Sequence, residues 1–375
     1  MLENTSLMKN GLNKMFNSKH YVPILKWKRA EQGALKALSE EHKKRITPLI
    51  QFVMPKQGPN EELDDVIKKF EELLPLIPQK ILEVWGNDPI FIDFSLLFTT
   101  PLKVKSLNAI LRGGRKLGAA FIPVVHLNDD PQIKKAACVM AKESGSGICL
   151  RLICPDLIEL TDLHQKITEL LSNAGLAEKD FDLLVDIKET EENGEKYAKY
   201  LNLSQRIPNL HKWRTFTFAA GAFPQDLSGC KIDEENLVSR SDWNNWKAHA
   251  GIKNLKRKPA FADYTIQHPI YKEATQFFHP TSSIKYTLDN AWLIMKGKKQ
   301  KFEMYLASAA ELVKDTRYYG EDFSDGDKFI KEKADHFRVY IKNPAIKGTG
   351  STETWLRAGI NHHLVLVADQ VANLS

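Results

Sequence analysis

The chain has 375 residues, which suits one barrel of roughly 250 residues and an appendage of about a hundred. Its 53 basic and 47 acidic residues are interspersed and give a formal charge of only +6, so composition alone does not call for a nucleic-acid partner. No stretch approaches the ~20 apolar residues of a membrane span, and residues 1–19 lack the apolar run of a signal peptide. The four cysteines show no zinc spacing and fit a reducing compartment, so we expect a cytoplasmic protein without membrane contact.

The first element that we expect is a short helix within residues 1–19. The apolar residues of this segment have helical spacing; they are Leu7, Met8, Leu12, Met15 and Phe16. We expect this extension to close the bottom of the fold that follows it.

From residue 20 to about residue 274, one unit recurs eight times: a β-branched and aromatic run, then a charged segment of helical length. The runs are 21–28, 46–53, 89–95, 120–126, 147–154, 181–188, 213–221 and 259–266. Segments with helical periodicity lie at 61–74, 104–117, 133–143, 157–171 and 191–203. This alternation predicts an α/β fold, a TIM-barrel-like (β/α)8 barrel over residues 20–274.

The pattern changes at two places. The longest interruption, residues 222–238, follows the seventh run, so we expect it over the catalytic face of the barrel. Beyond residue 274, the segments 284–294 and 336–341 are strand-like or mixed, and 356–374 is strongly helical. We therefore expect residues 275–375 to form an α+β subdomain packed on the barrel.

Most of the eight runs finish on a polar or ionisable residue, at the end where barrel enzymes place their chemistry. If these side chains share an inward phase, they form a ring at the barrel mouth. The candidates for ligand binding are Lys26, Lys28, Gln51, Arg151 and Asp263, with Tyr264 as the alternative to Asp263. The candidates for catalysis are Asp93, His126, Asp186 and Lys188.

The ring allows several kinds of chemistry. Converging cations suit a phosphate or carboxylate, and Asp93 or Asp186 suits a general base while His126 suits a proton relay. Lys28 or Lys188 suits a Schiff-base nucleophile if burial lowers its pKa. No acidic pair has metal spacing, so we predict no metal site; the cofactor is unknown, and Mg²⁺ stays an option that no motif supports. An inert, salt-bridged plug explains the same charges equally well.

A second candidate site is the glycine- and hydroxyl-rich segment that enters the final helix. Backbone N–H groups there suit an anion, with Gly350, Ser351, Thr352, Trp355 and Arg357 as the residues concerned. The segment lacks the Gly-Lys-Ser/Thr of a Walker loop, and a capped helix docked on the barrel is the favoured interpretation. The adjacent His362 and His363 point about 100 degrees apart on a helix, so we expect one packed and one exposed.

Several stretches resemble the Beta protein family of satellite phages and bacterial defence islands. They are Tyr-Val-Pro-Ile-Leu-Lys-Trp-Lys at 21–28, followed by Glu31, Ala34 and Leu35, Ile-Thr-Pro-Leu-Ile at 46–50, Ser-Ile-Lys-Tyr-Thr at 283–287 with Trp292, and residues 355–363. In that family the founding member is encoded beside a small toxic protein, Gop, and a small DNA-binding regulator, and it suppresses killing by Gop. The resemblance implies an antitoxin-like or control component of an anti-phage module, and it implies no catalytic residues.

Two classes of function follow. In the first, the protein binds and restrains a Gop-like toxin, together with other components of the same module, and the barrel is a scaffold. In the second, the barrel is an enzyme or a sensor for a phosphate-bearing ligand, such as a nucleotide or phosphodiester. The sequence leaves open whether the chain is an enzyme. The lysine-rich stretches 253–258 and 296–301 keep nucleic acid open as a partner, although a solvated surface explains them more simply.

Overall fold

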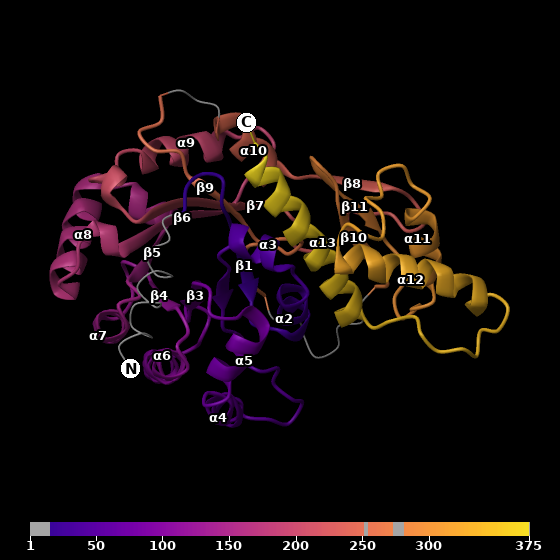
Figure 1. Ribbon diagram of the computed structural model, residues 1–375, viewed down its shortest axis with the longest axis horizontal. Coiled ribbons are helices and arrows are strands. Elements are labelled where there is room, and N and C mark those ends of the chain that lie inside the picture. The colour runs from indigo at the N-terminus through magenta and orange to yellow at the C-terminus, as the bar shows by residue number, and fades with distance from the viewer. Residues whose placement is uncertain (1–15, 251–253, 273–280, 375) are drawn as a thin grey trace.

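Eight parallel strands close into a barrel in the computed structural model, which describes residues 16–250, 254–272 and 281–374. The strands follow one another round the barrel in chain order, and the last pairs with the first (Figure 1). They are β1 (Tyr21–Lys26), β2 (Leu49–Gln51), β3 (Ile90–Asp93), β4 (Phe121–Val125), β5 (Ile148–Ile153), β6 (Phe181–Glu189), β7 (Thr215–Gly221) and β9 (Ala260–Asp263). Each falls on one of the eight predicted runs, so the TIM-barrel-like fold is confirmed.

Helices surround the barrel. In chain order they are α2 (Arg29–Lys36), α3 (Glu40–Arg45), α4 (Leu63–Leu73), α5 (Ile77–Trp85), α6 (Thr100–Lys116), α7 (Pro131–Ser144), α8 (Leu160–Ala174), α9 (Glu195–Ser204) and α10 (Ser241–Ala250). Single-turn 3-10 helices lie at Cys154–Leu157, Glu178–Asp180 and Leu210–Lys212.

Local sequence explains where α7 starts and stops. The carboxylate of Asp130 accepts the N–H of Gln132 at 2.8 Å and caps α7, whose first residue is Pro131. The helix ends at Gly145, which adopts the left-handed conformation that glycine tolerates best.

Alternate residues of the strands fill the lumen. Most of these side chains are apolar, and they form one buried cluster: Val22, Ile24, Leu49, Phe91, Ile122, Val124, Cys149, Leu184, Ala219, Ala262 and the ring of Tyr264. The other residues of the strands face the helices and form the larger core. The lumen is therefore packed. Polar side chains enter it toward the strand ends and also near the strand starts, where Asp182 accepts from Arg214 and Thr215.

A small antiparallel sheet stands beside the barrel. Its strands are β8 (Asn236–Ser239), β10 (Ile284–Thr287) and β11 (Ala291–Met295), in the order β10-β11-β8. Helices α11 (Met304–Leu312) and α12 (Asp325–Tyr340) pack with it (Figure 1). β8 was not predicted; it is the end of the insert after β7, and Phe223 of the same insert packs on Trp292 of β11.

The run at 336–341 is not a strand, and that prediction is wrong. Residues up to Tyr340 form the last turns of α12, and the apolar side chains Val339 and Ile341 are 48% and 60% exposed. Their alternation with polar residues therefore does not mark a buried face.

The final helix returns to the barrel, and its prediction is confirmed. α13 (Thr352–Ala372) packs against α2, α3 and β1 as well as against α12 and β10. It thus takes the place outside β9 and β1 where the eighth barrel helix belongs, and the small sheet is inserted before it. The division into residues 1–19, 20–274 and 275–375 stays a prediction.

Some predicted features lie partly or wholly outside the described residues. They include Leu7, Met8, Leu12 and Met15 of the extension, and Lys253 of the first basic stretch. Phe16 is described, and its ring stacks on His20 with 4.3 Å between centroids.

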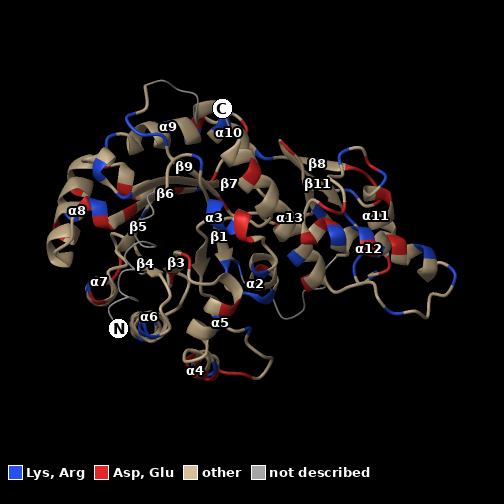
Figure 2. Cartoon of the chain, viewed as in Figure 1, with Lys and Arg blue, Asp and Glu red and all other residues tan. Residues whose placement is uncertain are grey.

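None of the described helices combines the length and apolar character that crossing a bilayer requires. Acidic and basic residues are interspersed along the helices (Figure 2).

The close crossing of α12 and α13 generates a stability prediction. A Cβ atom at Gly326 would overlap the backbone carbonyl of Ala358, and two helix backbones cannot easily move apart. Gly326→Ala should lower the free energy of unfolding by about 2–3 kcal/mol in denaturant titrations. The control is Gly229→Ala, which has open space around it and should change stability by less than about 0.5 kcal/mol. Equal stability of the two variants would contradict this crossing.

Candidate functional site

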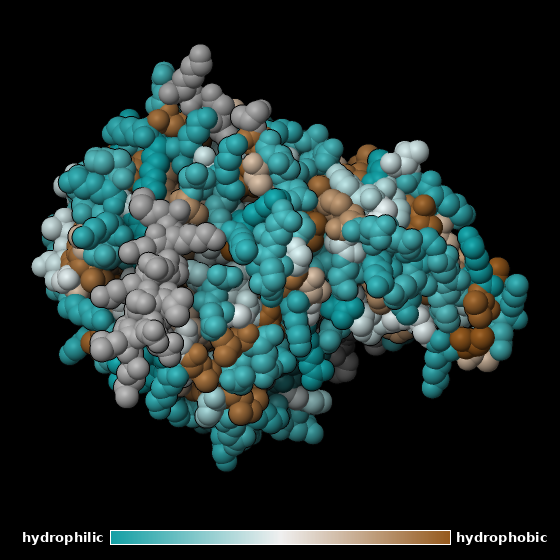
Figure 3. All heavy atoms as spheres, in the orientation of Figure 1, coloured by the Kyte–Doolittle hydropathy of each residue, from teal (hydrophilic) through white to brown (hydrophobic). Residues whose placement is uncertain are grey.

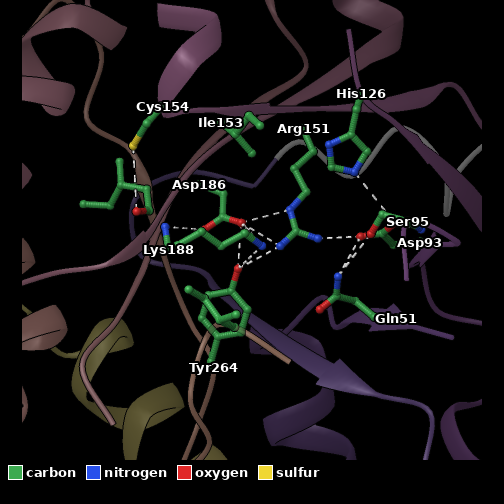
Figure 4. Close-up of polar contacts among 12 residues, drawn as sticks. Gln51, Asp93, Ser95, His126, Arg151, Ile153, Cys154, Asp186, Lys188 and Tyr264 are labelled. Atoms are coloured by element: carbon green, nitrogen blue, oxygen red, sulfur yellow. Dashed lines mark hydrogen bonds and ion pairs between the residues drawn. The ribbon is translucent and has the colours of Figure 1, made fainter. Parts of the chain in front are cut away.

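Buried charged groups meet where strands β2, β3, β5 and β6 end (Figure 4). Because side chains alternate along a strand, Gln51, Asp93, Arg151 and Asp186 all point into the lumen, and each is at most 3% exposed. Tyr264 follows β9 and joins them from the opposite side. We call Asp93, Arg151, Asp186 and Tyr264 the ionic plug.

Arg151 is the centre of the ionic plug and has no exposed surface. Its Nη1 donates to Asp93 Oδ2, and its Nε and Nη2 donate to Asp186 Oδ2 at 3.1 and 2.6 Å. Its Nη2 also donates to the Tyr264 hydroxyl at 2.8 Å. A guanidinium engaged on three partners has little capacity left for a ligand.

The two carboxylates are held in their ionised form. Burial alone would raise the pKa of Asp93, but the His126 ring and the Arg151 guanidinium hold that pKa well below its usual range. At Asp186, burial is likewise outweighed by Lys188, Arg151 and a hydrogen bond from Tyr264, and the pKa is again far below normal. Two such weak bases are poorly suited to take up a proton at neutral pH.

Lys188 reaches the ionic plug because strand β6 is irregular. The register with β7 shifts between Asp186 and Glu189, and Lys188 adopts a φ of 60°, an uncommon value for a residue other than glycine. Its Nζ lies 2.9 Å from both Asp186 Oδ2 and the Tyr264 hydroxyl. Burial and the charge of Arg151 lower the pKa of Lys188, although Asp186 opposes them. Bulges and strained residues of this kind concentrate at functional sites.

The other predicted residues lie around this group. Lys26 is 3% exposed, its Nζ is 3.4 Å from the carbonyl oxygen of His268, and burial lowers its pKa to about 8. Lys28 is exposed, and its Nζ donates to the Tyr271 hydroxyl at 3.0 Å. His126 is half-buried, with Nε2 3.8 Å from Asp93 Oδ1. We call Lys26, Lys28 and Lys188 the mouth lysines.

Asp263 does not belong to this ring, and the expectation that it faces the lumen is wrong. It points outward from β9, where it accepts from the Tyr21 hydroxyl at 2.5 Å and lies 2.9 Å from His363 Nε2 on α13. Tyr264 takes the inward position one residue later. The expectation for the histidine pair is wrong as well, because His362 and His363 are both fully buried, each against a carboxylate.

The glycine-rich segment before α13 is engaged in capping. Ser351 Oγ accepts the N–H of Thr354 at 3.2 Å, and Trp355 Nε1 donates to the carbonyl oxygen of Thr349 at 2.9 Å. The ring of Trp355 stacks on Tyr305. Gly350 has the positive φ of 81° that this turn requires, Thr352 begins the helix, and Arg357 lies over the Phe329 ring. These contacts favour the capped helix over an anion site.

The geometry thus brings Gln51, Asp93, His126, Arg151, Asp186 and Lys188 together, with Lys26 and Lys28 above them. No group of three or more potential metal-ligating side chains occurs among the described residues. Sequence reasoning gave Tyr264 only as an alternative and missed Glu31 of α2, which is 2% exposed. The alternation of Ala260, Ala262 and Tyr264 was a usable signal for Tyr264. Glu31 lies on a helix, so the alternation within strands could not reveal it.

A family model described as Beta protein matches residues 21–369. No curated protein matches the sequence.

The ionic plug should behave as one energetic unit. Arg151→Met leaves two buried carboxylates without a counter-charge and should cost about 3–5 kcal/mol of unfolding free energy at pH 7. Adding Asp93→Asn and Asp186→Asn to that variant should recover much of the loss. The exposed Arg115→Met, which removes a pair with Glu143, should change stability by less than about 1 kcal/mol.

The same variants should differ in their response to acid. The pKa values of Asp93 and Asp186 are depressed in the folded protein, so their contribution is present above the ordinary Asp pKa of about 4 and is lost below it. Without Arg151 the carboxyls favour protonation, so Arg151→Met should instead gain stability as the pH falls from 7 toward 5. If the unfolding free energies of the wild type and of Arg151→Met changed in parallel with pH, Arg151 would not be the group that keeps Asp93 and Asp186 ionised.

Proposed function

The chain belongs to the Beta protein family, and we propose that it is an antitoxin-like, regulatory component of an anti-phage defence module that binds and restrains a toxic partner. The family match over residues 21–369 carries the proposal, because it spans the barrel and the small sheet alike. The expected partners are a Gop-like toxin and the other components of the same module, and the expected compartment is the cytoplasm.

The barrel interior supports a scaffold role. The lumen is filled with apolar side chains, and the donors of Arg151 are engaged on the chain's own carboxylates. A closed, packed barrel is rigid, so a partner that docks on its outer surface meets a preformed shape. Restraining a toxin requires such a surface and no chemistry in the lumen.

Co-expression with the toxin of the same module tests this proposal. The tagged chain should recover the toxin as a stable complex and should relieve its toxicity in growing cells. Gly326→Ala, which weakens the packing of α12 on α13, should relieve toxicity less well at raised temperature, while Gly229→Ala should act as wild type. Failure of the wild-type chain both to bind the toxin and to relieve its toxicity would overturn the proposal.

A second candidate function is a barrel enzyme or sensor that acts on a phosphate-bearing ligand, a nucleotide or phosphodiester. The observation that favours it is the bulge that brings Lys188 beside Asp186 while 35% of its side chain stays exposed. Lys26 and Lys28 lie at the same mouth. The ammonium groups of Lys28 and Lys188 are accessible to an entering anion, and the buried Lys26 adds positive charge behind them. A sensor would couple occupancy of the mouth to release of the toxin.

Lys188→Gln distinguishes the two candidates. It removes one positive charge from the mouth and leaves the fully buried Arg151 in place. If the mouth binds a ligand that defence requires, protection against phage should fall at least about tenfold while the toxin complex still forms. The control is Lys199→Gln on the outer surface of α9, which should protect normally. Full protection by Lys188→Gln would contradict the second candidate and leave the first intact.

A further inference from the structure

A large cleft lies beside the barrel mouth and is separate from the ionic plug. It has a volume of about 1080 Å³ and is bounded by α2, the segment after β2, helices α4 and α5, and the start of α13. Lys28 belongs both to this cleft and to the mouth. The volume is at the upper end of the range for small-molecule sites, so a mononucleotide fits easily. We call it the α2–α5 cleft.

Glu31 is the feature of the α2–α5 cleft that calls for a ligand. This residue of the first turn of α2 is 2% exposed, and its Oε1 accepts from Gln267 Nε2 at 2.8 Å. Its Oε2 is buried and has no hydrogen-bond partner. Leaving a buried carboxylate oxygen unsatisfied is costly, and a ligand N–H in the cleft would remove that cost.

The walls around Glu31 suit a flat ring. Trp27 is half-buried and lines the cleft, and its ring packs at a tilt on that of the buried Phe52, with 6.2 Å between the ring centroids. The other face of Phe52 is stacked on Phe94. Apolar side chains also come to the surface over α4 and α5 (Figure 3), where Leu73 and Leu76 line the cleft. An aromatic ligand would therefore find its stacking partner in Trp27.

The rim supplies positive charge. Lys28, Arg29, Lys56 and Lys80 line the cleft, and Lys28 lies on the side shared with the barrel mouth. Glu83 and Glu353 are the other acidic residues of the lining. A ligand that pairs with both Glu31 and the basic rim therefore carries an N–H group on a planar ring at one end and an anionic group at the other.

We propose that the α2–α5 cleft binds a nucleoside phosphate with an amino-bearing base. Glu31 Oε2 accepts the exocyclic amino N–H, Trp27 stacks on the base, and Lys28 with Arg29 binds the phosphate. This inference goes beyond toxin restraint and does not depend on it, because the cleft and its unsatisfied oxygen are present in the free chain.

Calorimetric titration of the full chain with AMP, CMP, UMP and inorganic phosphate tests the proposal. AMP and CMP should bind with dissociation constants below about 1 mM, and AMP should quench tryptophan fluorescence. UMP presents a carbonyl where CMP has its amino group, so it should bind at least about tenfold more weakly than CMP. Inorganic phosphate alone should bind more weakly than any of the nucleotides.

Variants identify the groups responsible. Glu31→Gln removes the charged acceptor and should weaken AMP binding at least about tenfold. Glu332→Gln removes an exposed carboxylate on α12, outside the cleft, and should leave the affinity within about twofold. Trp27→Leu should weaken AMP binding and abolish the fluorescence change, which keeps the test valid if Glu31→Gln misfolds.

Three outcomes would overturn the proposal: no binding of AMP or CMP by the wild type up to about 1 mM, equal affinities for CMP and UMP, or unchanged AMP affinity in both Glu31→Gln and Trp27→Leu. These readouts are independent of the toxin. A chain that restrains the toxin but binds no nucleotide would refute this inference alone, and the converse result would refute only the proposed function.

Discussion

The pairing of one buried guanidinium with two buried carboxylates constrains the whole upper half of the barrel. Arg151, Asp93 and Asp186 are each at most 1% exposed, and none of the three charges is tolerable there without the others. They stand on β5, β3 and β6, so their contacts hold the register at which these strands end. A shift of one residue in any of them would turn its charge outward into the apolar layer beneath the helices.

This constraint divides the lumen into two zones. Below the ionic plug the barrel is mostly apolar, apart from the buried pair of Asp182 with Arg214 near the strand starts. Above the ionic plug, Lys26, Lys28, Lys188 and His126 lie toward the mouth. The lysines there are unusual because burial lowers the pKa of Lys26 to about 8 and also lowers that of Lys188. These lowered pKa values would let the two ammonium groups respond to an anion at neutral pH if one binds at the mouth. A scaffold for a partner and a sensor for a ligand can share this arrangement.

The sequence predicted the barrel well because eight repeated units make the strand signal redundant. It also predicted which strand ends carry charge, since the period of two is strict within a strand. At β9 it failed, because Asp263 was chosen for its charge although the alternation with Ala260 and Ala262 favours Tyr264. The partner of Asp263 outside the barrel, His363, is not visible in the local sequence. His363 is 100 residues distant in the chain. Glu31 was missed for a related reason: its burial depends on Gln267, 236 residues away, and nothing in the local helical pattern reveals it.

The helix that completes the outer layer of the barrel comes from the C-terminal end of the chain. The segment that covers the outside of β9 and β1 is α13. Strands β10 and β11 and helices α11 and α12 lie between it and the last barrel strand in the chain. During synthesis the first and eighth strands can therefore pair while one flank of that seam is still bare of its helix. Contacts between segments so far apart in the chain form slowly during folding. Until α13 docks, the uncovered outer face of β9 and β1 is therefore the surface at which chaperones and proteases would act on the growing chain.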